Sequence, residues 1–240
     1  VAGGEVECRI GNAMSPYHYG RGWHITSTCG VFGAAAAVGS LLRLDGDRML
    51  HAFSAAAVQS SGLVEALGTM AKSISVGGAA RGGLLSALMA RNGLTGPTAI
   101  LTGERGYLRV YTDAPRPEAL VAGLGSEWEI ATNTYKPYPV GVVLNPVIDA
   151  CLSLREQKGL TLEQVAEIEL TGHPLLRQRT DRPNAGTGRE GQVSAQHAIA
   201  IALLRGRAGL EEFSDAAAAE TLRSGRPEVR FHDDPVREIG

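Results

Sequence analysis

The segment YGRGWHITSTCGVFGAAAAVGS, which starts at Tyr19, places one histidine directly before a run of small residues. His24 precedes Thr26, Ser27 and Thr28, whose hydroxyls are favourable at a helix N-terminus. The first turn of a helix carries free N–H groups and a partial positive charge, so it can bind a carboxylate. A histidine there is suited to proton transfer beside that carboxylate, and we expect Thr26 to contact the substrate. The alternative is a buried, hydrogen-bonded histidine at a helix start.

A second cation stands in the segment GTMAKSISVGGAARGG. Lys72 lies a few residues ahead of Gly77 and Gly78, where we expect another helix to begin. The glycines allow a ligand close to backbone amides, and the ammonium group adds a charge for an acid substrate. The alternative is a solvated loop lysine next to glycines that serve tight helix packing. Two cations, each ahead of a small-residue helix, favour a shared anion site.

Two further candidates come from the second half of the chain. In NTYKPYPVGVV, prolines stiffen the segment that carries Lys136 and Tyr138, and we expect these two residues to bind substrate. A surface lysine on a proline-protected edge strand is the alternative. His197 lies early in the apolar helix of VSAQHAIAIALL and is a candidate second acid or base. A satisfied, half-buried histidine is the alternative there.

Composition and motifs exclude several classes of function. The chain has 240 residues, a formal net charge of -2 and no basic stripe, so we expect neither a nucleic acid nor a membrane partner. No apolar run reaches the roughly 20 residues of a membrane-spanning helix. Cys8, Cys29 and Cys151 are scattered, which predicts reduced thiols in the cytoplasm and no metal site. Dinucleotide, phosphate-loop and nucleophile-elbow motifs are missing, so acid–base chemistry without a cofactor remains.

The pattern of elements that must position these residues changes along the chain. Residues 1–110 predict helix after helix, rich in alanine and glycine and closely packed. A polar linker follows at 111–125, and residues 126–240 predict an α+β part. The fold class is therefore mainly α with a second α+β part. Within it we expect helices at 31–44, 48–60, 79–91, 146–158, 194–204 and 209–222, and strands around 127–143 and 165–170.

The blocks GWHITSTCGVFGAAAAVGSLLRLD, GTMAKSISVGGAARGGLLSALMARNGLTGP, YKPYPV and SAQHAIAIALLRGRAGLEEF resemble the MmgE/PrpD family through most of residues 5–215. This family includes 2-methylcitrate dehydratase, cis-aconitate decarboxylase and iminodisuccinate epimerase. The resemblance implies a helical large domain, incomplete here, with a smaller α+β lid domain, in a homodimer. It implies proton transfer at a carbon next to a carboxylate, on a small di- or tricarboxylate, without metal or organic cofactor.

The family's histidine and two lysines match His24, Lys72 and Lys136, and its site lies between the two domains. His197 stands where many members have tyrosine, and Ser75 stands where a histidine commonly follows the first lysine. Gly141 and Asn145 occupy places that often hold Cys or His, and an acidic Asp-Thr-His segment would lie upstream of Val1, so we expect the chain to be a fragment. The leading hypothesis is a 2-methylcitrate dehydratase-like lyase. An epimerase, a truncated non-catalytic member and a helical acid-binding module are the alternatives.

Overall fold

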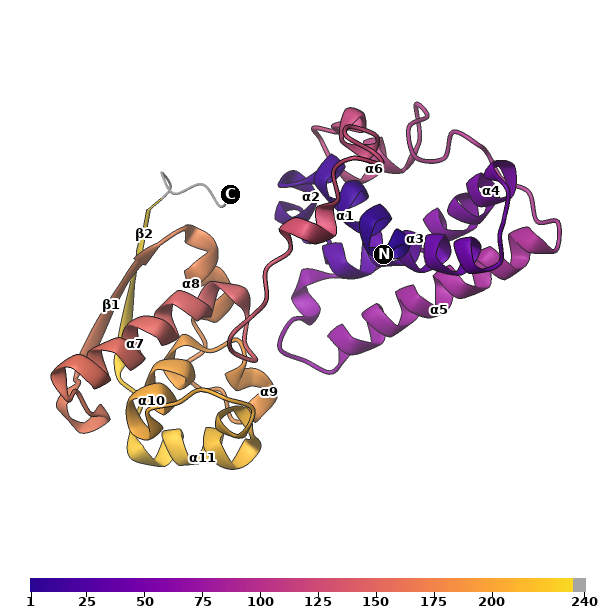
Figure 1. The fold of residues 1–240 in the computed structure, drawn as a ribbon. Coiled ribbons are helices and arrows are strands. Elements are labelled where there is room, and N and C mark those ends of the chain that lie inside the picture. Colours follow the sequence, from indigo (N-terminus) through magenta and orange to yellow (C-terminus); the bar gives the residue numbers. More distant parts are fainter. Residues whose placement is uncertain (235–240) are drawn as a thin grey trace. The chain divides into compact units, whose positions relative to one another are not determined.

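The computed structural model describes residues 1–234, and the chain divides into two compact units, Val1–Thr134 and Tyr135–Gly240 (Figure 1). The prediction of a mainly helical chain with a second α+β part is confirmed. Residues 126–134, predicted to be part of the lid, belong to the first unit, and the last six residues of the predicted lid, 235–240, lie outside the described part.

The described residues of the first unit form helices, 3₁₀ turns and loops, with no β-strand. The site depends most on α3 (Ile25–Leu41) and α5 (Ala71–Arg91). Helix α3 starts six residues and helix α5 eight residues before its predicted N-terminus. The unit contains α1 (Ala2–Met14), α2 (Tyr17–Gly20), α3 (Ile25–Leu41), α4 (Gly46–Ala57), α5 (Ala71–Arg91), α6 (Tyr107–Tyr111) and short 3₁₀ turns at Val64–Ala66, Pro117–Leu120 and Glu129–Thr132.

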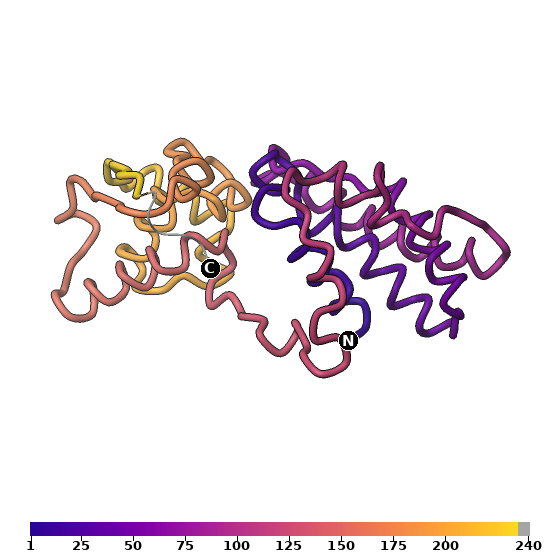
Figure 2. Tube along the Cα trace, turned by 90° about the horizontal axis from the view of Figure 1, so that it is seen from above, coloured from indigo at the N-terminus to yellow at the C-terminus, as the bar shows by residue number. Residues whose placement is uncertain are grey.

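Small residues let α3 pack closely against α5, and the two helices lie side by side in Figures 1 and 2. Gly83 of α5 lies directly on the backbone of α3, since a Cβ there would come within 2.6 Å of the Ala35 nitrogen and closer still to Ala34 and the Val31 carbonyl oxygen. Such a contact is possible only for glycine. The helix ends where expected, with Asn92 at its C-cap and Gly93 at a φ of +94°.

A buried ion pair explains why the segment after residue 120 belongs to the first unit. Arg9 donates to Glu5 at 2.6 Å and to the carbonyl oxygens of Ala122 and Glu127 at 2.6 and 2.9 Å. The other Glu5 oxygen accepts the Glu129 N–H at 2.9 Å. Residues that read as a polar linker and a strand are therefore bound to α1, and the 127–143 strand prediction is wrong because 3₁₀ turns form there instead.

The second unit has a core built around the apolar helix α10, against which α7 packs. Its two strands, β1 and β2, are parallel and pair Glu167 with Glu228. The predicted helices 146–158 and 194–204 and the strand near 165–170 are confirmed, whereas β2 falls in a tail that we read as unpatterned. The elements are the 3₁₀ turns Val142–Leu144, Leu162–Gln164 and Glu211–Phe213, helices α7 (Asn145–Lys158), α8 (Pro174–Thr180), α9 (Gly188–Gly191), α10 (Ala195–Arg205) and α11 (Asp215–Ser224), and strands β1 (Glu167–Gly172) and β2 (Glu228–Asp233).

None of the helices formed by residues 1–234 combines the length and apolar character needed to cross a bilayer.

Candidate active site

The N-terminal ends of α3 and α5 meet in the first unit. The Ser27 and Ser75 hydroxyl oxygens, each in the opening turns of its helix, lie 2.9 Å apart. Further along both helices Gly83 packs on Val31, so α3 and α5 run in the same direction. Their free N–H groups and partial positive charges consequently lie at one end of the helix pair, which favours an anion there.

His24 occupies the N-cap position of α3 and is only 5% exposed. Its backbone N–H donates to the Gly62 carbonyl oxygen at 3.0 Å, and its ring Nδ1 lies 2.8 Å from the Ser27 hydroxyl. Gly62 has a φ of +138°, and a Cβ there would come within 2.6 Å of the Ser27 Cβ. The 62 loop therefore holds both His24 and Ser27 in place and tolerates only glycine at this point.

Lys72 stands in the first turn of α5, close to His24. The Ser75 hydroxyl donates to the Lys72 carbonyl oxygen at 2.8 Å, which connects the lysine backbone to the Ser27–His24 pair. Burial lowers the pKa of His24, and the Lys72 ammonium lowers it further. His24 is therefore neutral at pH 7, as a proton acceptor must be. The structure thus brings together two of the predicted site residues.

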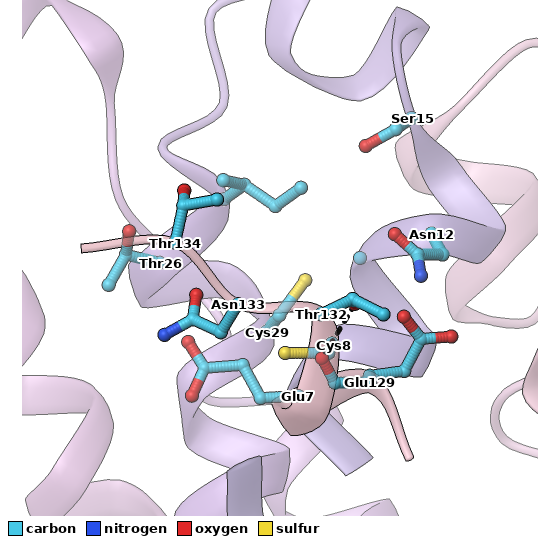
Figure 3. A pocket seen from close by; sticks show the side chains of 12 residues that line it. Glu7, Cys8, Asn12, Ser15, Thr26, Cys29, Glu129, Thr132, Asn133 and Thr134 are labelled. Carbon is cyan, nitrogen blue, oxygen red and sulfur yellow. Dashed lines mark hydrogen bonds between the residues drawn. The ribbon is translucent and has the colours of Figure 1, made fainter. Parts of the chain in front are cut away.

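A cavity of about 350 Å³ opens on the other side of the first turn of α3, between α1 and the 129–134 segment (Figure 3). Thr26 contributes to its wall, so this threonine lies apart from the hydroxyl contacts of His24. Glu7 also lines the cavity, and burial raises the pKa of its carboxyl group. Among residues 1–234, no lysine, arginine or histidine lines it. The cavity is therefore unsuited to a carboxylate, and the predicted role of Thr26 in substrate binding gains no support from it.

Lys136 and Tyr138 lie at the start of the second unit. The Lys136 ammonium donates to the Val140 carbonyl oxygen at 3.2 Å, and the side chain is exposed. The Tyr138 hydroxyl donates to Asp149 at 2.5 Å, and burial together with this carboxylate raises the pKa of Tyr138 to about 12. Tyr138 thus stays protonated near neutral pH. The predicted substrate-binding roles of both residues stay predictions.

His197 is fully buried in the core of the second unit. Its Nε2–H donates to the Glu212 carbonyl oxygen at 2.9 Å, and Nδ1 lies 2.9 Å from the Thr221 hydroxyl. Burial lowers the pKa of His197 to about 4. With both ring nitrogens engaged and no exposed surface, this residue has the geometry of the satisfied core histidine, and we propose no catalytic role for it.

Sequence reasoning did not identify the hydrogen bonds of Ser27 and Ser75, although both residues were named among the sequence features. Each stands three residues after the predicted cation of its helix, His24 and Lys72. That spacing returns a side chain to the same helix face and is the signal that could have identified them. Within residues 1–234, no group of three or more His, Cys, Asp and Glu side chains could hold a metal ion. The expectation of cofactor-free chemistry stays a prediction.

The chain thus has a helical first unit, with a histidine and a lysine at adjoining helix N-termini, and a smaller α+β second unit. The sequence matches the MmgE/PrpD N-terminal domain over residues 1–120 and the MmgE/PrpD C-terminal domain over residues 138–236. The chain belongs to the MmgE/PrpD family.

Similar curated proteins include a cis-aconitate decarboxylase of Aspergillus terreus, which is 30% identical over 239 residues, covering 90% of this chain and 47% of that protein. A cis-aconitate decarboxylase-like protein of Aspergillus oryzae is 29% identical over 240 residues, covering 90% and 48% respectively. The human cis-aconitate decarboxylase is 25% identical over 215 residues, covering 87% and 43%. The chain spans about half the length of the curated relatives it matches.

Proposed function

We propose that this chain forms part of a cofactor-independent lyase that acts on a small di- or tricarboxylate by proton transfer at the carbon next to a carboxylate. Decarboxylation of a cis-aconitate-like acid is the leading reaction, because the similar curated proteins carry that name. This replaces dehydration of 2-methylcitrate as our first choice. The observation that carries the proposal is the placement of His24 and Lys72 at the adjoining N-termini of α3 and α5.

Each group has a defined part in this chemistry. The Lys72 ammonium and the free N–H groups of the two helix ends would bind one carboxylate of the substrate and stabilise the negative charge that develops on it. His24 would move the proton. Its lowered pKa keeps the ring neutral and ready to accept a proton at pH 7, and makes the protonated ring a strong donor in the following step.

One carbanionic intermediate connects the possible reactions. Loss of CO₂ from the substrate leaves its electron pair on carbon, and His24, after its ring has taken up a proton from solvent, would deliver that proton there. Removal of a proton by neutral His24 would create the same kind of carbanion, which expels hydroxide in a dehydratase or is reprotonated on the opposite face in an epimerase. Substrate binding by Lys136 and Tyr138 is part of this proposal and rests on the family resemblance. A homodimer in the cytoplasm is the assembly we propose.

The test uses the full-length gene product with cis-aconitate, 2-methylcitrate and iminodisuccinate, and measures CO₂ release, water loss and epimerisation. We expect CO₂ release from cis-aconitate and a loss on the order of 10²–10⁴ in kcat for His24→Ala. The matched control is His232→Ala, since His232 is an exposed histidine on β2. Unchanged turnover in His24→Ala would remove His24 from the mechanism.

Lys72→Ala should weaken the binding of every acid in the panel, whereas Lys158→Ala, at an exposed lysine of α7, should not. Calorimetric titration with the preferred acid measures this directly. Equal affinity in the two variants would contradict the proposed anion site. If CO₂ release does not exceed background but 2-methylcitrate loses water or iminodisuccinate is epimerised, the reaction is a dehydration or an epimerisation carried out by the same residues.

A further inference from the structure

We infer that Ser27 and Ser75 are positioning residues that fix His24 in the Nδ1–H tautomer and so leave Nε2 as the nitrogen that exchanges the proton with substrate. This inference rests on the proposed function of His24. The observation behind it is an unbroken series of contacts: His24 Nδ1 to Ser27 at 2.8 Å, Ser27 to Ser75 at 2.9 Å, and Ser75 to the Lys72 carbonyl oxygen at 2.8 Å.

The direction of these hydrogen bonds follows from their last member. A carbonyl oxygen only accepts, so the single hydroxyl proton of Ser75 goes to Lys72. The Ser75 oxygen must then accept from Ser27, whose own proton is used in that bond. Ser27 is left as an acceptor towards His24, and Nδ1 must carry a proton. One backbone carbonyl on α5 therefore sets the tautomer of a ring on α3.

The arrangement suits a group that changes its protonation state during a reaction. Nδ1 donates to Ser27 in both the neutral and the protonated ring, so none of these hydrogen bonds reverses when the proton is exchanged. Nε2 alone titrates, and within residues 1–234 it has no hydrogen-bond partner that would compete with a substrate. Fixing the tautomer in advance avoids reorganisation at the moment of proton transfer.

Ser27 is also well protected from alternative partners, and Ser75 is half-buried. Ser27 is fully buried beneath Gly62, and its hydroxyl lies between His24 and Ser75. Close packing of α3 on α5 holds the two serines at hydrogen-bond distance. The two hydroxyls thus connect the helices at the point where the proposed substrate carboxylate would bind, and their role is distinct from that of Lys72, which would bind it.

Ring ¹⁵N spectroscopy of the full-length protein tests the tautomer without any substrate. In the neutral form we expect a protonated Nδ1 and an unprotonated Nε2 for His24, assigned by loss of its signals in His24→Gln. Ser75→Ala frees the Ser27 proton to be donated to Nδ1, so the His24 signals should shift towards the Nε2–H tautomer. Ser75→Thr, which keeps the hydroxyl, should restore the wild-type signals. Ser40→Ala, at an exposed serine of α3, is the matched control.

Kinetics give the second measurement. Ser75→Ala should lower kcat on the order of tenfold, the factor that one hydrogen bond provides, with KM unchanged and with recovery in Ser75→Thr. A wild-type ring protonated on Nε2, or His24 signals unaltered in Ser75→Ala, would overturn the inference. If the tautomer is as expected but no acid is turned over, the proposed function fails and the positioning role stands. If turnover is normal and the tautomer is reversed, only the positioning role fails.

Discussion

Replacing Gly83 by alanine tests the close contact on which the site depends. A Cβ at this position would come within 2.6 Å of the Ala35 nitrogen, compared with an ordinary contact of 3.4–4 Å, and the neighbouring atoms belong mainly to the backbone of α3. A backbone cannot swing aside as a long side chain can, so the two helices must separate by about 1 Å. A gap of that size forfeits between a quarter and a half of the attraction of each contact.

Overpacking of this kind costs about 1–3 kcal/mol, and because the obstacle is backbone we take the upper half of that range. Alanine returns about 1 kcal/mol through its higher helix propensity. The net loss for Gly83→Ala is therefore about 1–2 kcal/mol. Gly77, in the same helix, has no atom within 4 Å of the place where a Cβ would lie. Gly77→Ala should consequently stabilise the unit by about 0.5–1 kcal/mol.

Thermal unfolding followed by circular dichroism distinguishes the two variants. For a unit of this size each kcal/mol moves Tm by about 4 °C. We expect a Tm about 4–8 °C lower for Gly83→Ala and about 3 °C higher for Gly77→Ala. Separation of the helices should also disturb the Ser27–Ser75 contact and hence the His24 ring signals. Equal stability of the two variants, or a more stable Gly83→Ala, would refute the close packing of α3 on α5.

Three other predictions concern charge and burial. Arg9→Ala leaves the buried Glu5 carboxylate without its cation and should lower the free energy of unfolding of the first unit by about 3–5 kcal/mol, measured by urea unfolding. An unchanged urea midpoint would show that this ion pair does not fix the 122–129 segment. Cys8 is exposed, whereas Cys29 is buried and its pKa is raised to about 12, so a maleimide should modify Cys8 alone in the native protein. The reaction should be slower than that of a free thiol, because partial burial and the nearby Glu7 raise the pKa of Cys8. Folding lowers the pKa of His197 from near 6.5 to about 4, so the unfolded state binds a proton at a higher pH than the folded state does. The second unit should therefore lose about 3 kcal/mol of stability as the pH is lowered from 6.5 to 4.

The control for the pH prediction is His197→Gln, which has no titrating ring at this position and should show a flatter stability profile over the same interval. An identical pH dependence in both proteins would mean that another group controls the acid sensitivity. For the thiol prediction, mass spectrometry after proteolysis identifies the modified cysteine, and early modification of Cys29 would contradict its buried position.

The sequence alone determined what local rules can determine. Helix-favouring runs, the Asn92–Gly93 stop and the apolar segment of α10 each depend on residues only a few positions apart. The structure has helices at these runs, although α3 and α5 begin six to eight residues earlier than the pattern indicates. The position of His24 at a helix start belongs to the same class, because capping involves only the adjoining turn. The family resemblance likewise followed from short blocks in order.

Tertiary structure decided which residues meet. The contact of Ser27 with Ser75 joins positions 48 apart, and α3 is apolar on every side, so its sequence does not indicate which face turns towards α5. The same holds for His197: its local sequence suits a reactive or a satisfied ring equally well, and only the tertiary structure shows that Thr221 and Glu212 engage its two ring nitrogens. Long-range pairing depends on how surfaces of small residues fit together, which no local pattern records.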